Sequence, residues 1–366
     1  MLNSIAFVGS EGPHISKFLN FFSNYFKKII LITNKIPENT PLNCTVYKVD
    51  FSFKKIWNIY ISVKKIKEIL EKEQPEIIHI HQANSYAFYS LLANRKYDIP
   101  VLLSPWGSDI LILPKQNILM REMVKYNLKH ADIITLESFF EAKVVRDLIR
   151  NTEKDIRILN FGIYDDYLVD IEEALKGKEN IIFSNRLHKK MYRVDKIIES
   201  FGELIKSKSY TDWKLVIAGE GEDTLKLKKL ACANNLAENV EFVGWLDKNS
   251  LKEWYLKSKI FISIPESDGI PFSMLEAMAC GCLPVVSNVP SVLEFLIDGI
   301  NAIVVENINS LDLYIKKAIE LTNNRDFVYD MISLNRKIIQ KHGVYSKNMK
   351  KYLDIYNELL SRKRIK

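Results

Sequence analysis

The stretch IFISIPESDGIPFSMLEAMACG, residues 260–281, has the pattern of a strand, a polar loop and a short helix. Its first residues are mostly apolar and β-branched, which is typical of a buried strand. Pro271 stands at a position that the start of a helix tolerates, and Gly281 stands where helices commonly end. In open parallel sheets, ligands bind at the loops that leave the carboxyl ends of the strands. The stretch therefore predicts a parallel α/β sheet whose loop at 265–271 faces a ligand.

Short β-branched runs alternate with helical patterns along the rest of the 366 residues. This repetition predicts parallel sheets with helices on both faces. The length suits two domains, because single domains cluster at roughly 100 to 200 residues. We therefore expect an α/β protein of two doubly wound domains that face a central cleft. The runs are SIAFVGS (4–10), KIILIT (28–33), EIIHIHQ (76–82), NIIFSN (180–185), KLVIAGE (214–220), VEFVGW (240–245), IFISIPE (260–266), PVVSN (284–288) and AIVVE (302–306).

The segment DDYLVDIEEALKGKEN, residues 165–180, is acidic and has no strand pattern. We place the link between the domains there, with the boundary near residue 163. The predicted domains are 1–163 and 164–344, followed by a basic amphipathic helix over 345–366.

Positive charge is concentrated at the two ends of the chain. The formal net charge is +7; residues 1–160 contribute +6, residues 341–366 another +6, and residues 161–340 contribute −5. This asymmetry favours an anionic partner for the first domain, either a membrane surface or a phosphorylated acceptor. A generally lysine-rich composition explains the excess equally well. No nucleic acid partner is expected.

The sequence has no feature of a secreted or membrane-spanning protein. Its start lacks the segments of a signal peptide, and there is no run of about 18 uncharged apolar residues. The four cysteines have no spacing typical of disulfides or zinc sites. We expect a protein of the reducing cytoplasm, acting there or at the inner face of the cell membrane.

Residues 51–73 mix aromatic and aliphatic side chains with lysines, among them Trp57, Tyr60, Lys54 and Lys64. A basic amphipathic helix of this kind either lies in a membrane interface or packs on its own sheet. Packing on the sheet is the commoner outcome.

Two carboxylates accompany the loop of the opening stretch. Asp268 lies in the loop, and Glu276 follows eight positions later in the first turns of the helix. Backbone N–H groups and the dipole at a helix start bind a diphosphate or sugar hydroxyls. A carboxylate such as that of Glu276 accepts hydrogen bonds from vicinal hydroxyls, for example those of a ribose. Taken alone, the two residues would be interpreted as a loop Asp and a solvated helix Glu.

This block resembles the signature of glycosyltransferase family 4, whose members have the GT-B fold of two Rossmann-like domains. The signature is Glu, seven residues, Glu, Ala-Met-Ala-Cys-Gly and a Pro-Val-Val strand, and here Asp268 stands in place of the first Glu. The resemblance implies that Glu276 holds the nucleotide ribose and that Asp268 holds the donor sugar. It implies further donor contacts from the loop residues Gly269, Ile270, Pro271 and Phe272.

The resemblance covers nearly the whole chain. It implies an acceptor-binding N-terminal domain, a C-terminal domain that binds the nucleotide sugar, and a last helix that crosses back to the first domain, next to Lys54 and Lys64. Gly219 is a further nucleotide contact by the same resemblance. The matching passages are residues 75–111, 158–163, 214–222, 240–247 and 293–305.

Cations follow the strand pattern at 180–185. Transfer from a nucleotide sugar expels a diphosphate, and fixed cations aimed at the developing charge accelerate such a step. Arg186 and Lys190 are the candidates. Family 4 usually has a Lys-Gly pair after Gly-Arg-Leu, whereas this chain has Met191-Tyr192-Arg193. Lys190, Lys189 and Arg193 all stay open as the replacement for that lysine, and a solvated basic loop is the alternative.

On the acceptor side, a glycine loop that includes Gly12 follows the first strand, as in the family. His81 ends the strand pattern IIHIH, and Trp106 stands where many relatives have a His. His81 is therefore the candidate for a polar contact at the reacting centre. A core histidine at a strand end is an equally good interpretation.

The resemblance implies a retaining hexosyltransferase of lipopolysaccharide or capsule biosynthesis. The donor would be a nucleotide diphosphate sugar, UDP first and GDP second, and the acceptor a lipid-linked compound or a glycan. For a retaining transfer we expect no covalent nucleophile and no cofactor, since the leaving diphosphate can itself take the proton of the acceptor. We also expect no metal, because the sequence has neither an Asp-x-Asp motif nor a His/Cys cluster with metal spacing. Two alternatives stay open: a nucleotide-sugar epimerase or hydrolase on the same scaffold, and a non-catalytic partner subunit.

Overall fold

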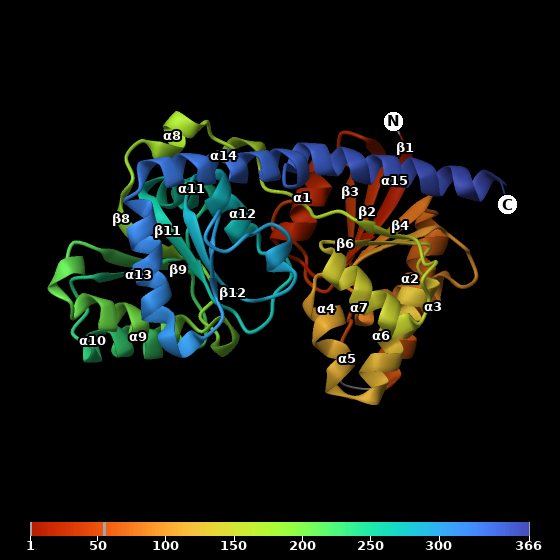
Figure 1. The fold of residues 1–366 in the computed structure, drawn as a ribbon. Coiled ribbons are helices and arrows are strands. Elements are labelled where there is room, and N and C mark those ends of the chain that lie inside the picture. The colour runs from red at the N-terminus through yellow and green to blue at the C-terminus, as the bar shows by residue number, and fades with distance from the viewer. Residues whose placement is uncertain (1, 54–55, 366) are drawn as a thin grey trace. The chain divides into compact units, whose positions relative to one another are not determined.

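A computed structural model describes residues 2–53 and 56–365 of the chain (Figure 1). The chain forms two compact units. The first consists of residues 1–161 together with 346–366, and the second of residues 162–345. No helix of the described residues is both long and apolar enough to span a bilayer.

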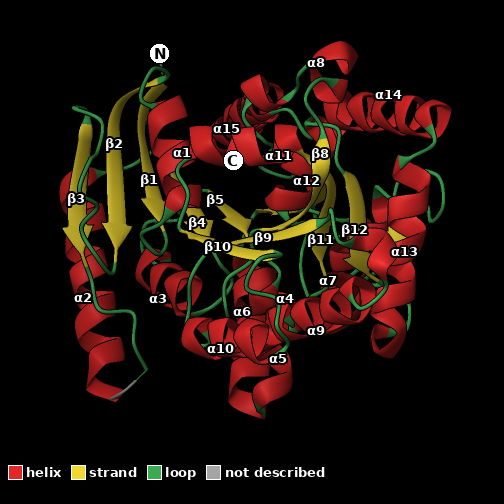
Figure 2. Cartoon of the chain, turned by 90° about the vertical axis from the view of Figure 1, so that its left-hand side faces the viewer, coloured by secondary structure: helices red, strands yellow, loops and turns green. Residues whose placement is uncertain are grey.

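The first unit is built on a seven-stranded parallel sheet in the order β3-β2-β1-β4-β5-β6-β7. The strand order reverses between β1 and β4, so this is a doubly wound sheet with its switch point between these two strands. Figure 2 shows β3, β2 and β1 side by side. The strands are β1 (Leu2–Val8), β2 (Phe26–Thr33), β3 (Cys44–Lys48), β4 (Ile77–His81), β5 (Val101–Ser104), β6 (Ile133–Leu136) and β7 (Ile156–Ile158).

Helices cover both faces of this sheet, because successive strand side chains point to opposite faces. Ala6 and Val8 belong to the core under α2, α3, α6 and α7. Phe7 faces the other way, where its ring contacts Phe18 and Phe22 of α1. The helices are α1 (Pro13–Phe22), α2 (Ile56–Glu73), α3 (Ser85–Asn94), α4 (Ser108–Leu111), α5 (Leu113–Gln116), α6 (Ile118–His130), α7 (Phe139–Ile149) and α15 (Tyr345–Ile365).

The last helix, α15, packs on the first unit beside α1 (Figure 1). Its Tyr356 hydroxyl lies 2.7 Å from Nδ1 of His79 on β4, and Tyr352 is fully buried. The expected neighbourhood with Lys64 is wrong, because α2 packs on the opposite face of the sheet. Lys54 lies outside the described residues.

The second unit has a six-stranded parallel sheet in the order β10-β9-β8-β11-β12-β13, which is also doubly wound. Ile182 of β8 packs with α9, α10 and α13, and Phe183 packs on the other face with α11 and α12. The fold class predicted from the sequence is confirmed in both units. The elements are β8 (Glu179–Ser184), β9 (Lys214–Ala218), β10 (Val240–Gly244), β11 (Ser258–Ser263), β12 (Leu283–Ser287), β13 (Ile303–Val305), α8 (Ile171–Leu175), α9 (Val194–Ile205), α10 (Thr224–Ala233), α11 (Lys248–Lys257), α12 (Phe272–Ala279), α13 (Leu311–Thr322) and α14 (Arg325–His342).

The acidic segment 165–180, expected to link the domains, is part of the second unit. Tyr167, Val169 and Ala174 are buried in the cores of that unit. Gly281 makes room for it, since a Cβ at this φ of +78° would lie 2.9 Å from Cβ of Ala174. The many acidic residues suggested an exposed linker, but the apolar side chains between them pack in the cores of the second unit.

Candidate active site

The loops that follow β8 and β11 meet at the carboxyl edge of the second sheet. These strands are neighbours, so loops 80 residues apart in sequence leave the sheet side by side. The amide of Glu266 donates a hydrogen bond to the carbonyl of Met191 at 2.9 Å, and Nε of Arg193 lies 3.4 Å from Oε1 of Glu266. The two loops therefore form one surface.

Arg186 is held by three partners on this surface. Its Nη2 lies 2.5 Å from Oδ2 of Asp268, and its Nη1 donates to Oγ of Ser273 at 3.0 Å. Its guanidinium carbon lies 4.5 Å from the centre of the Tyr192 ring. A guanidinium has five N–H donors in a rigid fork. A cation fixed in this way is suited to recognise an anion without reorganisation.

Asp268 is the partner of this cation and is itself largely buried, with 20% of its side chain exposed. Burial raises the pKa of its carboxyl group, and the nearby Arg186 acts in the opposite direction. The loop backbone is fixed by the last residue of β12 and by the segment that follows it. Oγ of Ser291 donates to the carbonyl of Asp268 at 2.7 Å, and Oγ of Ser287 donates to that of Pro265 at 2.8 Å.

Glu276 lies on α12, directly behind this loop, and is 8% exposed. The Tyr255 hydroxyl donates to its Oε2 at 3.3 Å, and Nδ2 of Asn185 donates to the Tyr255 oxygen at 2.8 Å. The carboxylate is thereby connected to the loop after β8. The predicted helix boundaries are confirmed, since α12 begins right after Pro271 and ends before Gly281.

Gly219, at the end of β9, allows the next loop to approach Arg186. Its φ is +98°, and a Cβ there would lie 2.7 Å from the Arg186 carbonyl oxygen. Any other residue would push the two loops apart. Gly219 thus shapes the site through its backbone, and its contact with a nucleotide stays a prediction.

The basic turn after Arg186 offers the three cations that the sequence left open. Lys189 and Lys190 are exposed, whereas Arg193 is paired with Glu266. Lys190 begins a short turn of 3-10 helix, three residues before Arg193. All three lie in the segment that joins Arg186 to α9, and all three stay candidates.

The acceptor-side candidates belong to the first unit. Gly12 precedes α1 as its N-cap residue. His81 is fully buried among aromatic rings, including those of Phe18 and Trp106, and burial lowers its pKa to about 3. Within the described part of the chain neither ring nitrogen of His81 has a hydrogen-bond partner. Its burial favours the interpretation of a neutral core histidine over that of a substrate contact.

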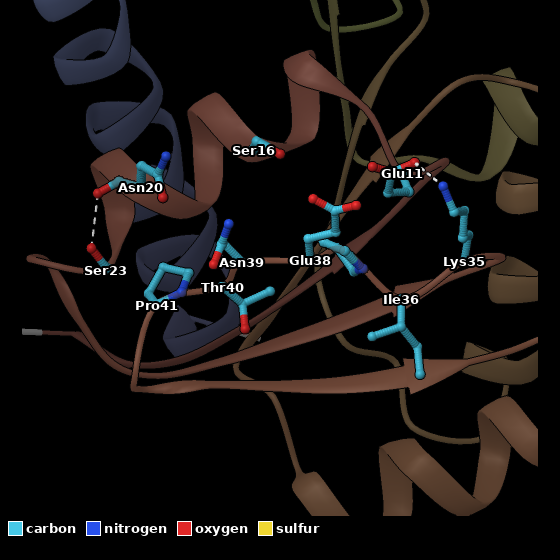
Figure 3. Close-up of a pocket in the computed structure, with 11 residues that line it drawn as sticks. Glu11, Ser16, Asn20, Ser23, Lys35, Ile36, Glu38, Asn39, Thr40 and Pro41 are labelled. Carbon is cyan, nitrogen blue, oxygen red and sulfur yellow. Dashed lines mark hydrogen bonds and ion pairs between the residues drawn. The ribbon is translucent and has the colours of Figure 1, made fainter.

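A polar cavity of about 590 Å³ lies in the first unit, between α1 and the loop joining β2 to β3 (Figure 3). The face of α1 contributes Ser16 and Asn20, and Glu38 projects toward the cavity from the loop. Glu11, in the predicted glycine loop, lies at one side with Nζ of Lys35 at 3.8 Å from its carboxylate. The lining offers hydroxyl, amide and carboxylate groups, which suit a ligand with many hydroxyls. This cavity could not be predicted from the sequence, because much of its lining comes from a loop without a recognisable residue pattern.

Sequence reasoning also missed Tyr255 and Ser273 as partners of the predicted residues. Tyr255 lies on α11, far in sequence from Glu276, and an isolated Tyr carries no signal. Ser273 stands inside the predicted stretch, next to Phe272, and could have been named from the sequence as a candidate site residue. No three or more His, Cys, Asp or Glu side chains are grouped for metal binding among residues 2–53 and 56–365.

Two family models match the chain. The model for glycosyl transferases group 1 matches residues 169–338, and the model for glycosyl transferase 4-like proteins matches residues 4–138. The chain is a glycosyltransferase of the family 4 type. The resemblance stated from the sequence is confirmed, and the enzyme is a transferase.

Characterised and uncharacterised relatives agree with this membership. The glycosyltransferase is 24% identical to an uncharacterized glycosyltransferase of Methanocaldococcus jannaschii, over 95% of this chain and 96% of the relative. It is 23% identical to N-acetyl-alpha-D-glucosaminyl L-malate synthase of Bacillus anthracis, over 81% of this chain and 78% of the relative. It is 23% identical to alpha-monoglucosyldiacylglycerol synthase of Streptococcus pneumoniae, over 65% of this chain and 57% of the relative.

Solved structures confirm the GT-B fold of the glycosyltransferase. Sucrose-phosphate synthase from Thermosynechococcus elongatus matches with a TM-score of 0.81 at 14% identity, over 99% of this chain and all of that one. HepE from Anabaena, in complex with UDP-glucose, matches with a TM-score of 0.79 at 11% identity, over 98% of this chain and all of that one.

Proposed function

We propose that this glycosyltransferase moves a hexose from a nucleotide diphosphate sugar to a glycolipid or glycan acceptor of the cell envelope. A UDP-sugar is our first choice of donor and a GDP-sugar the second. The observation that carries the proposal is the fixed Arg186, paired with Asp268 beside the start of α12. This arrangement puts a cation, a carboxylate and a helix N-terminus at one sheet edge. A diphosphate binds to the cation and to the helix N-terminus, and a sugar hydroxyl donates a hydrogen bond to the carboxylate.

In the proposed reaction each residue has a separate task. Arg186 stabilises the charge that develops on the leaving diphosphate, with help from one of the cations at 189–193. Asp268 orients a hydroxyl of the donor sugar, and Glu276 accepts hydrogen bonds from the ribose hydroxyls. Transfer retains the anomeric configuration without a covalent enzyme intermediate, because the leaving diphosphate takes the proton of the acceptor on the same face. The proposed mechanism needs no cofactor and no metal.

The relatives support the donor and acceptor classes. HepE is described in complex with UDP-glucose, and the pneumococcal relative is named as the synthase of a glucosylated diacylglycerol. A glycan acceptor carries many hydroxyls, which agrees with the polar cavity beside α1. Lipopolysaccharide or capsule biosynthesis is the process we propose.

We also propose that the first unit contacts an anionic membrane from the cytoplasmic side. This unit holds 29 Lys plus Arg against 18 Asp plus Glu, whereas the second unit holds 23 against 27. The inner face of α2 packs on the sheet through Ile66 and Ile69, but Trp57, Tyr60 and Ile61 are exposed, at 75%, 72% and 59%. Exposed aromatic residues near lysines are typical of helices that bind a membrane interface.

The test begins with the purified protein in EDTA and a thermal-shift screen against UDP, GDP, CMP and ADP. A ligand that binds only the folded state raises the melting temperature. A shift with UDP or GDP supports the proposed donor class without a metal. Transfer of labelled sugar from UDP-glucose or its GDP counterpart to a diacylglycerol acceptor then completes the test. If no nucleotide shifts the melting temperature and no sugar is transferred, the proposed function is wrong.

A further inference from the structure

Gln82, the residue directly after β4 in the first unit, has an unusual backbone. Its φ is +82°, and its amide donates a hydrogen bond to the carbonyl of Ser104 at 3.0 Å. Residues other than glycine rarely adopt positive φ, because the Cβ atom crowds the backbone. Strain of this kind is retained where the surrounding structure enforces it.

The other non-glycine residues with positive φ in the described chain differ from Gln82. Their φ values lie between 45° and 57°, within the ordinary left-handed region. Most of them directly follow or cap a helix, where that conformation is common. Gln82 instead follows a strand and lies outside this range. The five are Gln74, Asp98, Arg150, Arg193 and Asn235.

Two buried side chains from distant helices hold the backbone next to Gln82. Oδ2 of Asp109, on α4, accepts from the amide of Ala83 at 2.5 Å, and its Oδ1 accepts from the amide of Trp106 at 2.9 Å. Nδ2 of Asn127, on α6, donates to the carbonyls of Ala83 and Asn84 at 2.8 and 2.9 Å. Asp109 is 5% exposed and Asn127 is fully buried. These contacts fix the conformation that strains Gln82.

The side chain of Gln82 has an unused acceptor. Its Oε1 is buried and has no hydrogen-bond partner among residues 2–53 and 56–365. A buried amide oxygen without a partner is unfavourable, and glycine at this position would relieve both the strain and the unpaired oxygen. A glutamine in this position therefore points to a partner that comes from outside the chain.

The position of Gln82 indicates what that partner is. β4 pairs with β1 on one side and β5 on the other, so Gln82 leaves the sheet between the glycine loop and the loop that carries Trp106. Both loops belong to the acceptor side predicted from the sequence. A carboxamide donates and accepts hydrogen bonds, which matches a hydroxyl group, itself both donor and acceptor.

We propose that Gln82 binds a hydroxyl group of the sugar acceptor, and that Asp109 and Asn127 are positioning residues for it. This assignment rests on the proposed glycosyl transfer and adds a specificity-determining contact to it.

The test compares Gln82→Gly with Gln74→Gly, a matched control at the end of α2. Both changes remove a glutamine side chain at positive φ, but Gln74 is exposed and far from the loops in question. Both variants should fold, with melting temperatures no lower than that of the wild type. Gln82→Gly should raise the acceptor KM at least about tenfold, the effect of one lost hydrogen bond to a buried polar group, and should leave the donor KM unchanged. Gln74→Gly should leave both KM values unchanged.

The outcomes separate this assignment from the proposed function. If the wild type transfers sugar and Gln82→Gly has the wild-type acceptor KM, the role of Gln82 is overturned and the proposed function stands. A rise of the donor KM in parallel with the acceptor KM would indicate a general defect and overturn the role as well. If the wild type transfers no sugar to any hydroxyl acceptor, the proposed function and the role of Gln82 fail together.

Discussion

Nη2 of Arg186 lies 2.5 Å from Oδ2 of Asp268, and this ion pair joins the loop after β8 to the loop after β11. Only 11% of the Arg186 side chain and 20% of the Asp268 side chain are exposed. A pair so enclosed differs from the exposed pairs on helix surfaces, which contribute little to stability. The residues proposed to stabilise the leaving group and to orient the sugar therefore also hold the site together.

Replacing Arg186 should damage both activity and stability. Arg186→Ala leaves Asp268 largely buried without its cation and removes the proposed diphosphate contact. We expect turnover of the donor to fall at least about tenfold and the free energy of unfolding to fall by about 1–3 kcal/mol. Steady-state kinetics and urea denaturation measure the two effects. Lys206→Ala, which breaks an exposed pair with Glu203, is the control and should change neither. Normal turnover in Arg186→Ala would contradict the proposed role of Arg186 in stabilising the leaving diphosphate.

Replacing Glu276 should weaken donor binding more than it slows the chemical step. Glu276→Gln keeps the size of the side chain and an acceptor for the Tyr255 hydroxyl, but it removes the charge that we propose to accept hydrogen bonds from the ribose. We expect the donor KM to rise about tenfold, since a charged hydrogen bond contributes about 1.5–3 kcal/mol. Glu253→Gln, on the exposed face of α11, is the control. An unchanged donor KM in Glu276→Gln would contradict the role in ribose binding.

Buried carboxyl groups should make the first unit less stable as the pH rises from about 4.5 to 7. Burial raises the pKa of Glu141 to about 7, and the nearby Asp109 adds to this shift. Between the unfolded and folded pKa values the folded protein binds more protons than the unfolded chain, so stability falls with increasing pH in this window. Glu141→Gln keeps an acceptor for the Glu137 amide and should flatten this dependence. Urea denaturation at pH 5 and pH 7 measures the change. Glu153→Gln, an exposed position, should behave as the wild type, and an equally steep profile in Glu141→Gln would refute the prediction.

The proposed membrane contact through α2 depends on its exposed aromatic residues. The double change Trp57→Ser with Tyr60→Ser should lower binding to vesicles with anionic lipid at least about fivefold, because each ring contributes apolar area at the interface. Cosedimentation at two salt concentrations measures binding and its electrostatic part. Trp245→Ser alters a Trp of the second unit that is 67% exposed and serves as the matched control. Equal losses in both variants would contradict a specific contact through α2.

The sequence could predict the fold class because strand and helix periodicity are local properties. The strongest candidates, Arg186, Asp268 and Glu276, also follow from local order, since each stands in a loop or helix just after a strand pattern. What could not be predicted depends on packing between distant segments. Tyr255, the partner of Glu276, comes from another helix. The side of the sheet that α15 covers is set by contacts such as that of Tyr356 with His79. The acidic segment 165–180, expected to be a link, packs in the second unit through a few apolar side chains. His81 shows the same limit, because its spacing suits both a site and a core, and only burial separates the two.

The route of the chain has a consequence for how the protein is made. Residues 162–345 form the second unit without interruption, whereas the first unit lacks α15 until residues 346–366 have been added. Before that point Phe18, Phe22 and His79 have no Tyr352 or Tyr356 to cover them. On the ribosome, the second unit can complete its core first, although its residues are synthesised after most of the first unit. The first unit can close only after residues 346–366 have left the ribosome.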